Sequence, residues 1–238
     1  MDDASLRGVS LDFLLDFTWE HSAWHMSTRD VVSMIVQPAT AEHRKPYTSL
    51  LPEQQVGVPT LFLSHAWSNE FGLTVAAARK FASNGRKPAA AVFVWLDIFA
   101  ITQHRGEAQE RDLSRLEATI ARPECTTLVV LDPLGQPLSR CWCVFEFFAT
   151  LLHAGGRHGK LQVRVGSLQP GGTGELLPCN EVETLAELSA GVDAAKAEAT
   201  VPEDKAMILA RLEELGAASR DGVHELNRKL ARAVRHGW

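Results

Sequence analysis

The chain has 238 residues and a formal charge of −5, with 45% apolar and 22% charged residues. This composition is ordinary for a globular protein, so it excludes a chain that is disordered throughout and a collagen-like fibre. The mildly acidic balance also argues against a dedicated nucleic-acid binder, which usually carries a basic stripe.

The cellular compartment of the protein can be predicted from its targeting signals and its cysteines. The first residues lack the basic start and apolar stretch of a secretory signal, and the longest apolar run, 89–96, is too short to span a bilayer. We therefore expect a cytoplasmic protein without a membrane partner. No C-x-x-C pair or H-E-x-x-H occurs, so we expect structural thiols and no metal site; the cysteines are Cys125, Cys141, Cys143 and Cys179.

The N-terminal region, residues 1–57, is rich in aromatic residues. Apolar side chains over 11–24 recur at helical spacing, and a second short helix is expected from Thr28 until Pro38 stops it. A polar, turn-rich stretch follows. We expect a helical extension that packs on the next domain.

Residues 58–165 alternate between apolar strands and amphipathic helices. Continuously apolar strands indicate a sheet covered on both faces, and strand–helix alternation makes it parallel. The expected class is α/β: a flavodoxin-like, doubly wound parallel sheet of four to five strands. The expected strands are 60–64, 91–97, 126–132 and 161–165, and the expected helices are 68–84, 107–122 and 140–152.

Residues 166–238 begin with a loop rich in Gly and Pro, over 166–178. Three helices are expected after it, near 180–197, 202–215 and 221–235. We expect this segment to pack on the α/β domain as well.

Ligands of open parallel sheets bind beyond the carboxyl ends of the strands. The first expected strand ends in Ser64, His65 and Trp67, and the second ends in Asp97, with Gln103 and His104 in the loop that follows. The third ends in Asp132, for which a loop-capping role is favoured over ligand binding. Polar groups from distant parts of the chain are thus expected at one edge.

Glu146 is the most informative residue, because it is the only charge between Arg140 and His153. A buried carboxylate is costly unless it is paired or protonated. Trp142 and Cys143 precede it by four and three residues and so share its helix face. The carboxyl group either belongs to a functional site, or it has a structural role, in which it pairs with Arg140 or a distant base or caps an N-terminal segment.

Two other residues carry open alternatives. Ser64 is either a functional residue, as a nucleophile or a substrate contact, or a turn residue at a strand end, which is the more common case. No G-x-S-x-G motif surrounds it, so the nucleophile turn of a hydrolase is not supported. His65 is either a general base or a hydrogen-bonding partner of a neighbouring loop.

Three segments resemble the conserved boxes of TIR-like domains, in particular those of algae and other protists. They are TLFLSHAW over 60–67, VWLDIFAITQH over 94–104, and S-x-x-W-C-x-x-E on Ser139, Trp142, Cys143 and Glu146. The resemblance covers 58–165. The helical extension and the A-x-x-P-E-D-K-x-x-I stretch over 199–208 are also similar to those proteins.

The resemblance implies hydrolysis or cyclisation of NAD at the nicotinamide–ribose bond, with Glu146 as the catalytic carboxylate. NAD, or a related nucleotide, is then the substrate, and no cofactor is implied. Self-association into a homo-oligomer through the loop after the second strand is implied to switch activity on. The implied substrate-binding residues are Ser64, His65, Trp67, Asp97, Gln103, His104, Trp142 and Cys143.

Two other functions stay open from the sequence. The loop after Asp97 lacks the Asp-x-x-x-G pattern usual in TIR domains, and many TIR domains act only as interaction modules in signalling. The second alternative is a metal or thiol site that uses Cys141, Cys143 and a nearby histidine.

Overall fold

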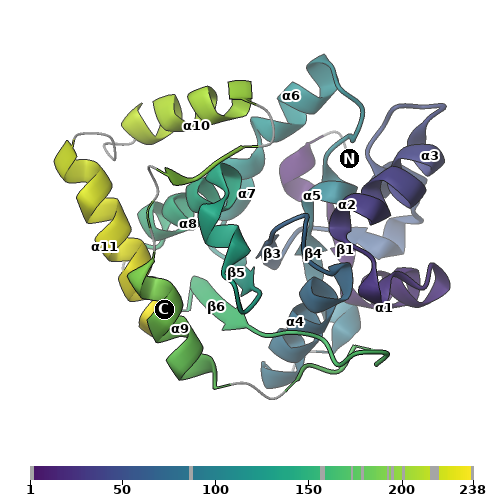
Figure 1. Ribbon diagram of the computed structural model, residues 1–238. Helices are drawn as coiled ribbons and strands as arrows, with labels where there is room; N and C mark the ends of the chain where they lie inside the picture. Colours follow the sequence, from purple (N-terminus) through teal and green to yellow (C-terminus); the bar gives the residue numbers. More distant parts are fainter. Residues whose placement is uncertain are drawn as a thin grey trace.

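The computed structural model describes residues 3–85, 88–155, 159–172, 174–177, 180–191, 193, 196–199, 202–214 and 220–236. Over these residues the chain is an α/β protein built on a mixed sheet of six strands, in the order β2-β1-β4-β3-β5-β6 (Figure 1). The strands are β1 (Gly8–Ser10), β2 (Val56–Gly57), β3 (Leu61–Ser64), β4 (Phe93–Trp95), β5 (Thr126–Leu131) and β6 (Leu161–Val165).

The four strands expected between residues 58 and 165 are parallel to one another. Phe62 pairs with Trp95 across β3 and β4, and Ser64 pairs with Val129 across β3 and β5. This part of the prediction is confirmed.

The expected number of four to five strands is wrong, because residues 1–57 add two more. β1 runs antiparallel to both β4 and β2 and extends the sheet at its edge. These strands have three and two residues, too few to show a period-two pattern. Gly57 is required here, because a Cβ at this position would lie 2.7 Å from the Phe93 ring.

Helices surround the sheet, and no helix among the described residues is both long and apolar enough to cross a membrane. The expected helix over 107–122 is divided in two near Ser114 and Arg115. The helices are α1 (Leu11–Glu20), α2 (Thr28–Val31), α3 (Gln37–Thr40), α4 (Phe71–Asn84), α5 (Asp97–Ala100), α6 (Glu107–Leu113), α7 (Leu116–Ala121), α8 (Cys141–His153), α9 (Glu181–Ala190), α10 (Pro202–Glu214) and α11 (Arg220–His236).

Pro38 does not stop the second helix, contrary to expectation. The chain continues from α2 through a π-helical turn, Val32–Val36, into α3, which contains Pro38. A π turn shifts the hydrogen-bonding register, and π turns and prolines are both known causes of irregularity within a helix. The proline therefore lies at a change of register rather than at a helix end.

The two faces of the sheet have separate cores. α1 and α4 cover the face that receives Leu61 and Leu63, while α7, α8 and α11 cover the face that receives Phe62 (Figure 1). Phe62 stacks on Trp95 there, with ring centroids 4.7 Å apart. Because side chains alternate along a strand, Ser64 projects to the same face as Phe62, which is the face of α8.

Candidate functional site

Residues from three elements meet where β3 and β4 end. Trp67, just beyond β3, donates its indole N–H to Asp97 Oδ2 at 2.7 Å, and Asp97 begins α5. Cys143 on α8 donates its thiol to the His65 carbonyl oxygen at 3.3 Å. We call Ser64, His65, Trp67, Asp97 and Glu146 the carboxyl-edge site.

Glu146 is the electrostatic centre of this site. Its side chain comes from the apolar helix α8, and the residue is only 8% exposed. The pKa of its carboxyl group is raised to about 8, mainly by burial and further by the negative charge of Asp97, against the opposing effects of the Ser64 hydroxyl and the Arg140 charge. The carboxyl group is therefore largely neutral at pH 7.

Two buried polar atoms of the carboxyl-edge site have no hydrogen-bond partner among the described residues. They are Ser64 Oγ and His65 Nε2, in residues that are 1% and 5% exposed. The Ser64 hydroxyl lies near the Glu146 carboxyl group and favours the ionised form of that carboxyl. The two groups do not have the geometry of a hydrogen bond. Buried polar groups are nearly always paired, so these atoms are poised to bond a ligand or water.

His65 does not carry a charge in this environment. Burial is the main cause that lowers the pKa of its imidazole, Asp97 partly offsets this shift, and Arg140 adds to it. A neutral ring at physiological pH can accept or donate a proton. Both sequence interpretations of His65 stay compatible with this geometry.

Arg140 is close to Glu146 but forms no ion pair with it among the described residues. The backbone of Arg140 caps the start of α8, and its charge lowers the pKa of the carboxyl. Arg140 therefore attracts the Glu146 carboxylate at longer range, without the direct ion pair that was one of the alternatives from the sequence.

The C-terminal segment holds the beginning of α8. Trp142 donates its indole N–H to Asp204 Oδ2 on α10 at 3.0 Å. The backbone of Glu198 bonds on both sides of this turn, donating to the Ser139 carbonyl at 2.8 Å and accepting from the Cys141 N–H at 2.9 Å. Sequence reasoning missed Asp204, and the P-E-D-K stretch was the signal that could have identified it.

Gln103 and His104 make contacts within and beyond their own loop. Gln103 Nε2 donates to the carbonyl oxygens of Asp97 and Ile101, both at 3.0 Å. His104 Nε2 lies 2.9 Å from Thr40 Oγ1 on α3. None of these contacts involves Glu146: the Gln103 side chain braces the loop internally, and His104 joins it to the N-terminal segment. Their contact with a substrate stays a prediction.

Asp132 has the capping role that the sequence favours. Its Oδ1 accepts from the Gln136 N–H at 2.8 Å, and its Oδ2 accepts from the Leu134 N–H at 3.1 Å. These bonds stabilise the turn that leads from β5 toward α8.

The metal or thiol alternative gains no support from the described residues. No three histidine, cysteine or acidic side chains gather there in a way that could hold a metal ion. Burial raises the pKa of Cys143 well above its usual range and also raises that of Cys141, so both thiols stay protonated and poorly reactive. Cys179 lies outside the described residues.

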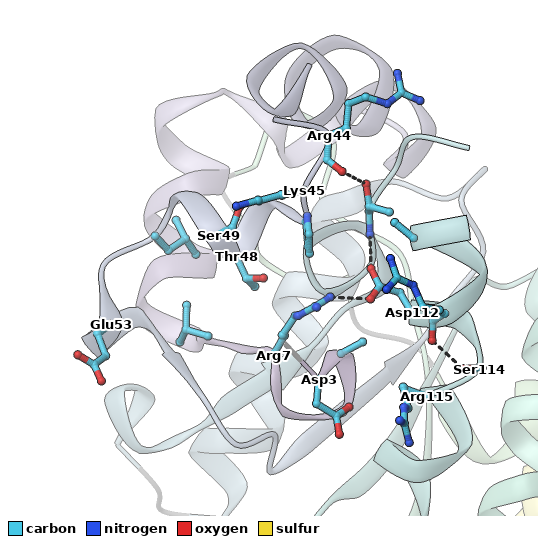
Figure 2. A pocket seen from close by; sticks show the side chains of 17 residues that line it. Asp3, Arg7, Arg44, Lys45, Thr48, Ser49, Glu53, Asp112, Ser114 and Arg115 are labelled. Carbon is cyan, nitrogen blue, oxygen red and sulfur yellow. Dashed lines mark hydrogen bonds and ion pairs between the residues drawn. The ribbon is translucent and has the colours of Figure 1, made fainter. Parts of the chain in front are cut away.

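A large cavity lies elsewhere in the molecule. Its volume is about 1040 Å³, and its lining includes Arg7, Lys45 and Asp112 (Figure 2). None of the residues of the carboxyl-edge site lines it.

Comparisons with protein-family models, with curated proteins and with solved structures each find no match to this chain. The assignment of function therefore depends on the site's own chemistry and on the motif resemblance.

Proposed function

We propose that this protein cleaves NAD at the nicotinamide–ribose bond, with Glu146 as the catalytic carboxylate. One observation carries the proposal: a buried carboxyl group lies beside the unpartnered hydroxyl of Ser64 at the carboxyl edge of a parallel sheet. A perturbed acid at such an edge is the expected mark of a functional site. The TIR-like motifs supply the identity of the substrate.

The chemistry needs one negative charge at a fixed position. When the bond between ribose C1′ and the nicotinamide nitrogen breaks, the electron pair leaves with nicotinamide and positive charge develops on the ribose. An ionised Glu146 stabilises that oxocarbenium-like centre, as carboxylates do in glycoside hydrolysis. Attack by water, which then loses a proton, gives ADP-ribose; attack by an adenine nitrogen of the same molecule gives a cyclic product.

The raised pKa of Glu146 fits a site that is completed by a cationic substrate. Within the protein alone, burial favours the neutral acid. The pyridinium ring of NAD would bring a positive charge against the carboxyl, and an opposite charge within about 4–6 Å favours the ionised form. Binding of NAD and ionisation of Glu146 are therefore coupled.

The neighbouring residues would position the substrate. The Ser64 hydroxyl is available to bond a ribose hydroxyl, because it has no partner among the described residues. The Trp67 ring is held by its bond to Asp97, which leaves its face to contact nicotinamide. Trp142 and Cys143 exclude water from the Glu146 side.

Access to Glu146 requires a rearrangement, because the residue is only 8% exposed. We propose that self-association provides it, as the TIR-like resemblance implies. The rate of NAD cleavage per molecule should then rise with protein concentration. A rate per molecule that is independent of concentration while the chain stays monomeric would refute the requirement for assembly.

The activity is tested by incubating the full chain with NAD and measuring nicotinamide by chromatography, with mass spectrometry to identify the second product. We expect nicotinamide together with ADP-ribose or its cyclic form. The alternative of a non-catalytic interaction module predicts self-association without any nicotinamide at high protein concentration.

A further inference from the structure

The cavity of about 1040 Å³ is enclosed by the N-terminal segment on one side and by α6 with its flanking turns on the other (Figure 2). Small-molecule sites commonly have volumes of about 300–1,000 Å³, so this one is large enough for a nucleotide-sized ligand. Its lining comes from residues 3–7, 44–56 and 102–115, three stretches far apart in the sequence.

The cavity is basic although the whole chain is acidic. Five basic and three acidic residues line it, while the chain carries a charge of −5. The acidic residues are Asp3, Glu53 and Asp112, and the basic residues are Arg7, Arg44, Lys45, Arg111 and Arg115.

A buried ion pair forms one wall of the cavity. Arg7 Nη1 donates to Asp112 Oδ1 at 2.8 Å and to the Ala100 carbonyl oxygen at 3.0 Å. Asp112 Oδ2 accepts the Thr102 N–H at 3.0 Å, which fixes the loop between α5 and α6. Because Asp112 neutralises Arg7, the other four basic residues face only two acidic ones.

Those four basic side chains come from opposite sides. Arg44 and Lys45 belong to the N-terminal segment, whereas Arg111 lies on α6 and Arg115 lies in the turn before α7. All four residues are exposed, and so accessible to a ligand in solution. Thr48, Ser49 and Ser114 also line the cavity (Figure 2), and the Ser114 hydroxyl donates to the Arg111 carbonyl oxygen at 2.7 Å.

We propose that this cavity binds a small molecule that carries two or more phosphate groups. Arginine forks and lysine ammonium groups bind phosphate oxygens through short, charge-assisted hydrogen bonds, and hydroxyl groups add further donors. Several cations around one cavity can contact more than one phosphate group, which a single surface lysine cannot do. The site is separate from the carboxyl-edge site and does not depend on the proposed NAD cleavage.

Titration calorimetry of the full chain with inorganic tripolyphosphate, ATP and citrate tests the proposal. We expect tripolyphosphate and ATP to bind at one site per chain, and citrate, which is anionic but lacks phosphate, to bind at least about tenfold more weakly. Equal affinity for ATP and tripolyphosphate indicates that the cavity recognises phosphates alone. Tighter binding of ATP indicates that it also holds the nucleoside.

A charge-matched pair of double variants separates site binding from general attraction. Arg111→Gln with Arg115→Gln removes two cations of the cavity, and Arg29→Gln with Lys80→Gln removes two exposed cations elsewhere. We expect the first variant to weaken binding by about tenfold or more and the second to leave it nearly unchanged. Equal losses in both, no binding to the wild-type chain, or citrate binding as tight as tripolyphosphate would overturn the proposal.

Unfolding curves show whether each variant is folded before its binding is compared. Lys45→Gln alone provides a second probe from the opposite side of the cavity, where a smaller loss in the same direction is expected. The probes contain no nicotinamide, so the outcome is independent of whether the chain cleaves NAD.

Discussion

The indole N–H of Trp67 donates to Asp97 Oδ2 at 2.7 Å, which joins the end of β3 to the beginning of α5. This hydrogen bond connects the ends of the first and second strands that were predicted from the sequence. The same carboxylate contributes a negative charge that raises the pKa of Glu146. Asp97 therefore positions Trp67 and also raises the pKa of the Glu146 carboxyl group.

Asp97→Asn should shift the pH dependence of NAD cleavage. The substitution keeps an oxygen that can accept the Trp67 N–H but removes the charge, so the pKa of Glu146 falls. Because the ionised carboxylate is the form that we propose to be active, kcat/KM should reach half its maximum at lower pH than in the wild type. An unchanged or higher midpoint, in rate measurements from pH 6 to pH 9.5, would contradict this role.

The wild-type pH profile follows from the same carboxyl group. With a pKa of about 8 in the free protein, kcat/KM should rise with pH up to a plateau above that value. A profile that falls as pH rises through this range would mean that Glu146 acts as the protonated acid instead.

Glu146 should also make the stability of the fold depend on pH. Its pKa is raised from 4.5 to about 8 on folding, so the folded chain holds an extra proton between these values. The stabilising contribution of the neutral acid is full below pH 4.5, falls by about 1.4 kcal/mol per pH unit at most, and is lost above about pH 8. Glu146→Gln should therefore be more stable than wild type at pH 8.5 and should lack this slope.

Urea unfolding of both chains at several pH values checks that expectation. The difference between wild type and Glu146→Gln is the relevant quantity, because other groups titrate equally in both. A difference that does not change between pH 5 and pH 8.5 would show that Glu146 is not buried as described.

The Arg7–Asp112 pair should be important for folding of the N-terminal segment. Asp112→Ala removes the counter-ion of a buried guanidinium and the acceptor of the Thr102 N–H, and breaking such a pair costs about 3–5 kcal/mol. The double variant Arg7→Met with Asp112→Leu should recover part of that loss. Thermal or urea unfolding measures both, and a single-variant loss below about 1 kcal/mol would count against the pair.

The hydrogen bond from Trp142 to Asp204 should hold α10 against α8, the helix that carries Glu146. Asp204→Ala should destabilise the chain by about 1 kcal/mol, since the group is partly exposed, and Asp204→Asn should restore most of the loss because it keeps an acceptor. Indole fluorescence during urea unfolding measures this. If alanine and asparagine behave alike, the hydrogen bond contributes nothing measurable.

The central part of the fold could be predicted because its signals are local. Apolar strands over 61–64, 126–131 and 161–165 and the helix with Glu146 follow from hydrophobic runs and periodicity. β1 and β2 could not, because strands of three and two residues are defined by their partners rather than by their own pattern. The π turn before Pro38 likewise depends on packing.

Some features of the candidate site could likewise be predicted from the sequence, and others could not. A buried acid in an apolar helix is visible in the sequence, and so are polar residues after strands. The contact between Trp142 and Asp204 spans 62 positions, and the basic cavity combines three distant stretches. Such relationships arise only from the folded chain, so no local pattern reveals them.

The most direct test of the central claim is the rate of nicotinamide release by three chains at one high protein concentration and pH 8. They are the wild type, Glu146→Gln, and Glu187→Gln, which removes an exposed carboxylate on α9. We expect wild type and Glu187→Gln to release nicotinamide at similar rates, and Glu146→Gln to be slower by about 100-fold or more while remaining folded. No release by the wild type, or release by Glu146→Gln at the wild-type rate, would contradict the account.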